Sequence, residues 1–268
     1  LRVTTDDRQS HLIRALGSDD PFERRDAARA LGEARTAEAV PALVAALERA
    51  APEGLEADSP EHASRAAAAV ALGLIGDPFA AEALLDAIAD GFNVGTAAST
   101  ALGRLKPPPV ERLVEALGDP APWRRARAVM ALGEIGDHSA FEAMRPLLWD
   151  PEDVVRRAAA SAFEKLRDPR AVAPLVELLA DESVSTFVRS YAAMALGALK
   201  DPLALESLTA AVDDDDALLR RAAARALCRI DDPRSRQRLR ELSATDPDKS
   251  VRDVVARYLT PRPGQREH

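Results

Sequence analysis

Arginine dominates the charged chemistry that this sequence could present on a surface. Arg221, Arg225 and Arg229 follow one another at intervals of four residues, so on a helix they share one face. Such a face could bind an acidic protein or the phosphates of a nucleic acid. Because it has no interleaved aromatic residues for base stacking, we expect a protein partner, and nucleic acid is the weaker alternative.

Residues that bind metals or act as nucleophiles are scattered along the chain. None of the four histidines has the i, i+4 partner of a helical metal site, and the acidic run at 213–216 lacks the turn Gly and distal Glu of a calcium loop. Cys228 takes a small position that most copies of a repeated motif fill with Gly, which favours a packed thiol over a nucleophile. We therefore predict no catalytic residue, no metal and no cofactor, and a chain that is not an enzyme.

A short repeat supplies the elements that would position these side chains. The tripeptide Ala-Leu-Gly, or a variant of it, recurs eight times with its large residue at positions 31, 72, 102, 132, 163, 196, 227 and 259. A small apolar residue stands four positions before this anchor, which is a helical period. We name the helix that carries the anchor B and the apolar helix between two B helices A. Four Asp-Pro pairs are predicted to start B helices, and they lie at 20–21, 119–120, 150–151 and 246–247.

The composition agrees with a stack of such units. Hydrophobic residues make up 47% of the 268 residues but aromatic residues only 4%, which indicates closely packed helices rather than a core of large rings. A two-helix unit cannot bury both of its faces alone, so the units must stack. We predict an all-α fold, an α-solenoid (α-α superhelix) of about eight two-helix repeats. It would form one domain over residues 1–260, followed by a polar C-terminal tail at 261–268.

Residues 150–160 show the repeat most clearly, as Asp-Pro-Glu-Asp-Val-Val-Arg-Arg-Ala-Ala-Ala. This pattern resembles the short HEAT-like repeat of the phycobilisome-lyase type, and the resemblance covers nearly the whole chain. In that family the repeated Arg pairs with the turn Asp of an adjacent unit. The resemblance therefore implies an internal ladder made of Arg24, Arg65, Arg125, Arg156, Arg189, Arg220 and Arg252, beside the turn acids Asp19, Asp119, Asp150, Asp181, Asp214 and Asp246.

Two irregularities interrupt the repeat. About ten extra residues at 50–62 predict a loop, which is either a tolerated surface insertion or a recognition loop. The third B helix has two glycines at 91–96 and lacks the ladder Arg, so it is either a loosened repeat or a place where the backbone approaches a ligand. Because some relatives attach or detach bilin chromophores, the resemblance keeps a bilin-lyase-like or other small-ligand-handling factor as the alternative function, with its pocket at this repeat.

The favoured function is a non-catalytic scaffold that binds a protein segment on the concave face of the B helices. Residues two positions before each anchor should point toward that face, because their neighbours are packed. Tyr191 lies close to them, and Met with Tyr is typical of adaptable protein contacts. With the basic stripe, the candidate partner-binding residues are Arg29, Val70, Thr100, Met130, Ser161, Tyr191, Met194, Arg221, Arg225, Arg229 and Arg257.

Charge and hydropathy set the remaining expectations. The net charge of −8 does not suit a chain that neutralises phosphates, although residues 216–268 hold 12 Arg and one Lys against eight acidic residues. No stretch approaches ~20 consecutive apolar residues, so we expect no membrane span. The single Cys fits a reducing compartment, which predicts a cytoplasmic protein.

Overall fold

The computed structural model describes residues 5–52, 54–56 and 58–260, and this part of the chain is all-helical. Its sixteen α-helices, with no strand among the described residues, confirm the predicted fold class. The predicted tail at 261–268 lies outside the described residues. The chain divides into two compact units, Leu1–Ala140 and Phe141–His268. That residues 1–260 form a single domain stays a prediction.

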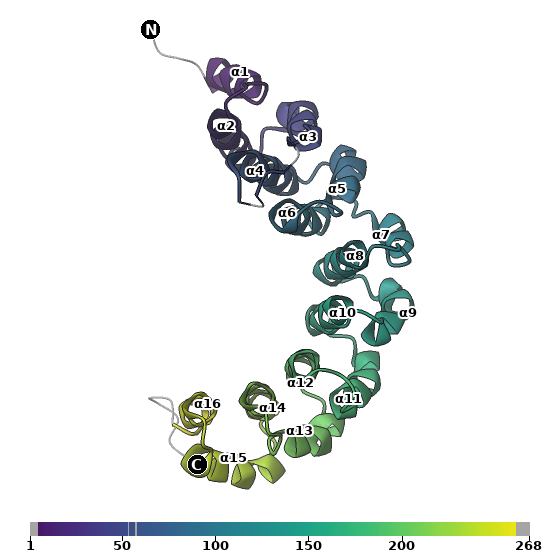
Figure 1. The fold of residues 1–268 in the computed structure, drawn as a ribbon, viewed down its shortest axis with the longest axis vertical. Coiled ribbons are helices and arrows are strands. Elements are labelled where there is room, and N and C mark those ends of the chain that lie inside the picture. Colours follow the sequence, from purple (N-terminus) through teal and green to yellow (C-terminus); the bar gives the residue numbers. More distant parts are fainter. Residues whose placement is uncertain (1–4, 53, 57, 261–268) are drawn as a thin grey trace. The chain divides into compact units, whose positions relative to one another are not determined.

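Unit 1 arranges its helices in two layers (Figure 1). The B helices lie side by side in one layer, and they are α2 (Pro21–Glu33), α4 (Pro60–Ile75), α6 (Phe92–Leu102) and α8 (Pro122–Ile135). The other helices are α1 (Thr5–Ala15), α3 (Val40–Glu48), α5 (Ala81–Ala87) and α7 (Val110–Ala116), with short 3-10 turns at Ala37–Ala39, Pro78–Ala80 and His138–Ala140. This is the predicted alternation of A and B helices.

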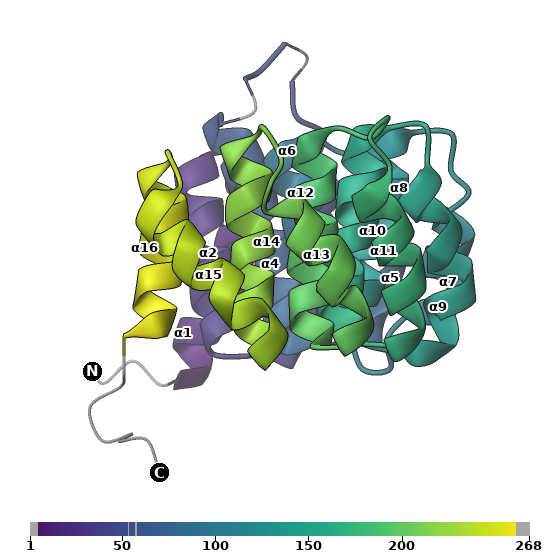
Figure 2. The same ribbon diagram turned by 90° about the horizontal axis from the view of Figure 1, so that it is seen from below.

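Unit 2 repeats the same plan (Figure 2). Its B helices are α10 (Asp153–Leu166), α12 (Thr186–Leu199), α14 (Ala217–Ile230) and α16 (Lys249–Leu259). Its A helices are α9 (Phe141–Met144), α11 (Val172–Ala180), α13 (Leu205–Ala211) and α15 (Pro233–Thr245), with 3-10 turns at Arg145–Trp149, Pro169–Ala171 and Pro202–Ala204. Each B helix of this unit packs against the next one along the chain.

The predicted Asp-Pro turns start their helices in two different ways. The Asp20 carboxylate accepts a hydrogen bond from the backbone N–H of Phe22 at 2.9 Å, and Pro21 opens α2 as predicted. In the other three turns the Asp carboxylate also accepts the N–H two residues later, but the helix begins farther on. The prediction is wrong there by two residues, because the Asp shapes a turn that precedes the cap. These helices begin at Pro122, Asp153 and Lys249.

Small residues let neighbouring B helices approach closely, and the anchors fill the core behind them. Seven anchor side chains are buried, and the eighth, Leu259, is half-buried at the end of the array. A Cβ atom on Gly73 would lie 2.7 Å from the Cα of Ala101, and Gly197 has the same relation to Ala226. The recurring Gly is therefore required by the distance between successive B helices.

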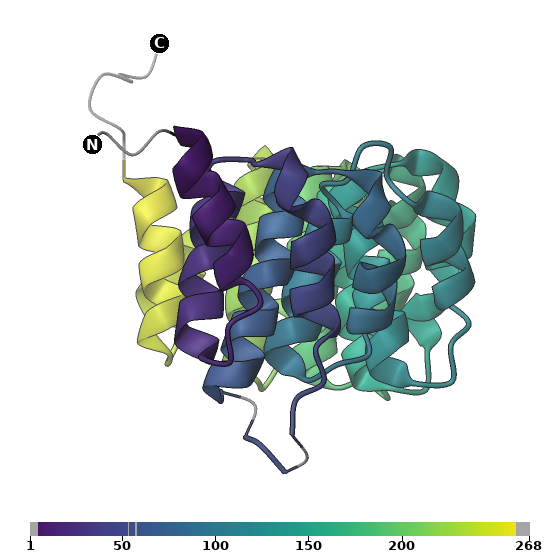
Figure 3. The ribbon, with the colours of Figure 1, turned by 90° about the horizontal axis from the view of Figure 1, so that it is seen from above.

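The predicted insertion is a loop. Helix α3 ends at Glu48 and α4 begins at Pro60, and the Ser59 hydroxyl accepts the backbone N–H of His62 as the helix cap. The described residues between these two helices, 49–52, 54–56 and 58–59, extend beyond the helix ends of unit 1 (Figure 3). The predicted range of 50–62 thus overran the start of α4.

Candidate functional site

The repeated Arg of the B helices holds the turn in front of its own helix. In five copies one guanidinium nitrogen donates to the carbonyl oxygens six and five residues earlier, at 2.5–3.0 Å. In the other two copies the Nε atom donates to a carbonyl at the end of an A helix, Arg65 to Leu47 and Arg189 to Leu179. These contacts satisfy backbone oxygens that the helices leave without partners. The repeated Arg is a structural residue.

The carboxylate partners of these arginines follow the expected ladder only in part. The predicted pairing with a turn Asp of the adjacent unit is confirmed for Arg189 with Asp214 at 3.1 Å and for Arg220 with Asp246 at 3.0 Å. Arg65 pairs with Asp90, which was not among the predicted turn acids. The predicted pairing is wrong for two other copies. Arg24 pairs with Glu61 at the start of α4, and Arg156 pairs with Asp153 of its own helix. In both cases a carboxylate in the first turn of a helix lies nearer than a turn Asp.

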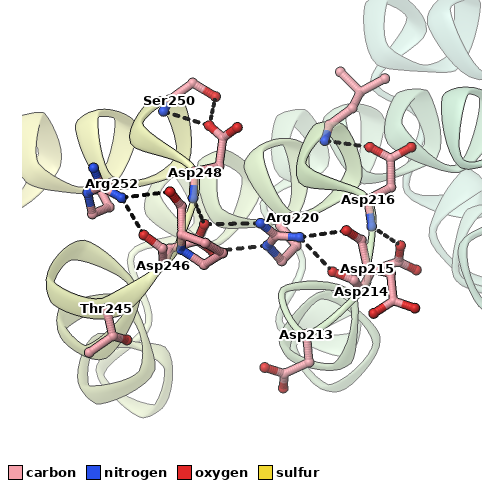
Figure 4. Close-up of polar contacts among 12 residues, drawn as sticks. Asp213, Asp214, Asp215, Asp216, Arg220, Thr245, Asp246, Asp248, Ser250 and Arg252 are labelled. Atoms are coloured by element: carbon pink, nitrogen blue, oxygen red, sulfur yellow. Dashed lines mark hydrogen bonds and ion pairs between the residues drawn. The ribbon is translucent and has the colours of Figure 1, made fainter.

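The acidic run at 213–216 caps and orders the turn before α14 (Figure 4). The carbonyl oxygens of Asp214 and Asp215 accept hydrogen bonds from Arg220. The Asp216 carboxylate accepts the hydroxyl of Thr186 at 2.6 Å and the backbone N–H of Leu218 at 2.8 Å. These two bonds, the hydroxyl first, lower the pKa of Asp216. The run thus has a structural role in this turn.

The third B helix is a loosened repeat, and a neighbouring side chain closes the gap. Gly95 stands at the ladder position, and the guanidinium of Arg127 from α8 lies against it, where any Cβ atom would overlap with it. Nη1 of Arg127 donates to the carbonyl oxygens of Ile88 and Asp90, in the turn that a ladder Arg would hold. Burial lowers the pKa of Arg127, and the nearby Asp90 partly offsets that effect. The alternative of a ligand pocket beside Gly95 is therefore wrong.

The predicted partner-binding residues all have accessible side chains. In unit 1, Arg29 and Val70 are exposed, while Met130 and Thr100 are half-buried. The Thr100 hydroxyl donates to the carbonyl of Thr96 within the same helix, at 3.1 Å. In unit 2 the exposed members are Arg221, Arg225 and Arg257, and the half-buried ones are Ser161, Tyr191, Met194 and Arg229.

Three of these residues meet at one hollow of unit 2. Met194 of α12, with Arg225 and Arg229 of α14, lines a space of about 270 Å³ together with Glu164, Ala222 and Ala226. Nη1 of Arg229 donates to Glu164 of α10 at 3.1 Å, so this ion pair reaches across the intervening helix. The guanidinium of Arg225 has no hydrogen-bond or ion-pair partner among the described residues. We name this space, with its six lining residues, the unit 2 hollow.

Aromatic side chains continue the surface beside the hollow. The Tyr191 ring packs edge-on against Phe187, with 5.4 Å between ring centroids, and the Arg157 guanidinium lies 5.5 Å from the Tyr191 centroid. Phe187 is 49% exposed, which is high for a ring of this size. The aromatic pair therefore adds accessible apolar area to a cationic surface.

Sequence reasoning missed Glu164, Ala222, Ala226 and Phe187. A signal for Glu164 was present, because it directly follows the anchor Phe163, where five copies of the repeat have Gly. A charged side chain cannot occupy that tight contact between helices, so it had to turn toward the surface. No such signal was present for Phe187, because its exposure depends on which helices pack beside α12.

The described residues include neither a reactive thiol nor a group of side chains arranged to bind a metal ion. Burial raises the pKa of Cys228 to about 12, with a smaller contribution from the charge of Asp231, so its thiol is protonated at neutral pH. Among residues 5–52, 54–56 and 58–260, no group of three or more His, Cys, Asp or Glu side chains is arranged to hold a metal ion. His268 lies outside these residues.

The described helices include none that is both long and apolar enough to cross a membrane.

Two models of one repeat family match the chain. HEAT repeats match residues 110–187 and 185–260, which together make up more than half of the sequence. The phycobilisome-lyase (PBS lyase) HEAT-like repeat matches residues 23–49 and 64–90. The resemblance that residues 150–160 suggested is confirmed.

Curated proteins with similar sequences are named deoxyhypusine hydroxylase. The protein from Candida albicans is 32% identical over 120 residues, which are 44% of this chain and 38% of that protein. The mouse protein is 28% identical over 246 residues, which are 81% of this chain and 79% of that protein. The chain therefore spans well under two thirds of the first of these relatives.

The chain is also similar to solved structures. The complex of CpcE and CpcF of phycocyanin lyase from Nostoc is 27% identical and covers 94% of each chain, with a TM-score of 0.48. A mutant of Kap121p is 14% identical and has a TM-score of 0.66 over 94% of this chain and 33% of that one. The second similarity supports the solenoid fold alone.

The prediction of a non-catalytic scaffold is wrong, and so is the prediction that the chain is not an enzyme. The curated proteins that resemble it over 44% and 81% of its length carry the name of an enzyme. The physical reason for the error lies in the repeat itself. Its pattern reports which positions pack between helices, and those positions are the same in catalytic and non-catalytic solenoids.

Proposed function

Because the chain belongs to the HEAT-repeat family, with repeats of the phycobilisome-lyase type, we propose that it is an enzyme that hydroxylates a protein. The observation that carries the proposal is the 28% identity to mouse deoxyhypusine hydroxylase over 81% of this chain. The reaction class comes from the name of that relative. In this proposal the substrate binds to the surface of unit 2.

A protein substrate suits the unit 2 hollow better than a free small molecule. At about 270 Å³ the hollow is smaller than the ~300–1,000 Å³ of ordinary ligand pockets, so it fits one side chain of a longer segment. Met194 forms its apolar part, and Tyr191 and Phe187 lie on the same helix. Met, Tyr and Arg are the residues that protein interfaces favour over other surfaces.

The charge of this face selects an acidic segment. Arg221, Arg225 and Arg257 are exposed, and none has an ion-pair partner among the described residues. Guanidinium groups without counter-charges attract carboxylates and bind them bidentately. The net charge of −8 over the whole chain favours a protein over a nucleic acid as the source of those negative groups.

Hydroxylation needs dioxygen and a reductant, which the residues of the unit 2 hollow do not supply. One oxygen atom of dioxygen is inserted into a C–H bond to give C–OH, and the second oxygen leaves as water, which takes up two electrons from a reductant and two protons. The side chains of the hollow hold and orient the substrate in this proposal, and no catalytic step is assigned to them. A cytoplasmic location is part of the proposal, because the half-buried, protonated Cys228 suits a reducing compartment.

The test uses the purified chain and a protein that carries deoxyhypusine. Both would be incubated with dioxygen, a reductant and a mixture of divalent transition-metal ions, and mass spectrometry would measure the gain of one oxygen atom. The mouse enzyme serves as the positive control. We expect the oxygen to be added, and more slowly by Arg225→Gln than by the wild type. If only the mouse enzyme modifies the substrate, the proposed reaction is wrong.

A further inference from the structure

A second hollow lies in unit 1, at the C-terminal ends of its B helices. Its volume is about 730 Å³, which is within the ~300–1,000 Å³ range of small-molecule sites. Leu74 and Ile75 of α4, Leu105 after α6 and Ile135 of α8 supply its apolar lining. We name this space the unit 1 hollow. Its residues come from four repeats, so no single segment of the sequence indicates it.

Three cationic side chains gather at the same hollow. Arg35 follows α2, while Arg104 and Lys106 follow α6, and all three are exposed members of its lining. None of their side chains has a hydrogen-bond or ion-pair partner among the described residues. The ladder arginines of the same unit, such as Arg24 and Arg65, are paired. A group of like charges without a counter-charge attracts anions.

Stabilisation of helix ends does not account for this group. Cations near a helix C-terminus can interact with the last carbonyl oxygens, which leaves those cations partnered. In unit 1 the contact that links these helix ends is made by backbone instead, since the N–H of Lys106 donates to the carbonyl of Gly76 at 3.0 Å. The charged ends of Arg35, Arg104 and Lys106 stay available to a ligand.

The backbone around the hollow is held in place. Gly73 allows α4 to touch α6, as a Cβ atom there would lie 2.7 Å from the Cα of Ala101. Leu105 is only 2% exposed, so the segment that carries Arg104 and Lys106 is anchored by its neighbour in the core. Arg104 and Lys106 therefore lie on either side of the buried Leu105, on a backbone that is held in place.

We propose that the unit 1 hollow binds a small organic anion that has an apolar body. A carboxylate or phosphate group would contact Arg35, Arg104 and Lys106, and the apolar body would lie against Leu74, Ile75 and Ile135. The site is separate from the unit 2 hollow, and it does not depend on the hydroxylation proposed above.

Isothermal titration calorimetry on the full chain tests this assignment. Octyl phosphate is the probe, octanoate supplies a carboxylate head group, and octanol and inorganic phosphate supply each half of the probe alone. We expect both amphipathic anions, or the one with the preferred head group, to bind more tightly than octanol and than inorganic phosphate. In Arg35→Gln and Arg104→Gln the affinity should fall roughly tenfold, which is the order of one charge-assisted contact.

Arg8→Gln is the matched control, because Arg8 is an exposed residue of α1 in the same unit. Its affinity should equal that of the wild type, and circular dichroism should show the same melting temperature for all three variants. Equal affinity of wild type, Arg35→Gln and Arg104→Gln would overturn the proposal. So would octanol binding as tightly as octyl phosphate, or inorganic phosphate binding as tightly as the amphipathic anions.

Discussion

Arg127 takes the place of a side chain that Gly95 does not have. Position 95 is the ladder position of the third B helix, where seven other copies have Arg. The Arg127 guanidinium enters from the next repeat and donates to the Asp90 carbonyl at 2.5 Å. The arginine missing at position 95 is therefore replaced in space by Arg127 of the following B helix, which bonds to the same turn.

Exchanging the two residues tests this relationship. Gly95→Arg alone should destabilise the chain, because two guanidinium groups cannot share one buried space, and overpacking costs about 1–3 kcal/mol. Arg127→Ala alone should also destabilise it, because two carbonyl oxygens lose their donor. The double variant should regain most of the stability in urea unfolding, with a coupling of about 0.5–3 kcal/mol. Strictly additive losses would show that the two positions do not share a site.

Arg220 should matter more for stability than Arg252. Both donate to the carbonyls of their own turn, but Arg220 also forms two bonds to the Asp246 carboxylate, at 3.0 and 3.1 Å. The Asp246 side chain is only 2% exposed. Arg220→Ala leaves that carboxylate buried without its cation, which costs about 3 kcal/mol, whereas Arg252→Ala should cost about 1 kcal/mol. Thermal unfolding of both variants measures the difference, and equal losses would contradict the assigned role of the Asp246 pair.

Acid should weaken the cap of α15 in a defined pH window. Hydrogen bonds from the side chain and then from the backbone N–H of Arg234 lower the pKa of Asp232 to about 2. An unfolded Asp titrates near ~3.9, so the stability from this cap is complete above about pH 4 and is lost as the pH falls toward 2. Between those values the melting temperature of the wild type should fall more than that of Asp232→Asn. Parallel curves for the two proteins would contradict the capping role.

Substrate binding should respond in opposite directions to two changes at the unit 2 hollow. Arg225→Gln removes a cation without a partner and should weaken binding of an acidic peptide, most of all at low salt. Glu164→Gln releases Arg229 from its ion pair and should strengthen that binding. The pair is about one third exposed, so stability should change by only ~0–1 kcal/mol. Fluorescence anisotropy of a labelled acidic peptide measures both effects.

Arg240→Gln is the control for this pair, because Arg240 is an exposed residue of α15 in the same unit. It should leave peptide binding unchanged. Weaker binding after Glu164→Gln would mean that the glutamate itself contacts the peptide. Tighter binding of a labelled oligonucleotide than of the peptide would identify nucleic acid as the partner instead.

The repeat could be predicted from the amino-acid order alone, because the residues that define it interact within about one helical turn. The spacing of Ala and Leu around each anchor predicts which side chains are buried, and seven of the eight anchors are. Asp20 and Ser59 start helices through bonds to residues two or three positions away. The cap that Asp216 gives to α14 is equally local, because its carboxylate accepts the backbone N–H of Leu218, two residues away.

The contacts between side chains of different repeats could not be predicted in this way, because they depend on how the helices pack in three dimensions. Arg24 finds Glu61, Arg229 finds Glu164 and Arg127 fills the space beside Gly95, over separations of 37, 65 and more than 30 residues. The two hollows depend in the same way on the packing of several helices. The helical period determines the face of the helix on which a residue lies. The distance between stacked repeats determines which side chain of the next repeat it contacts. That distance is fixed by close contacts such as the one between Gly73 and Ala101.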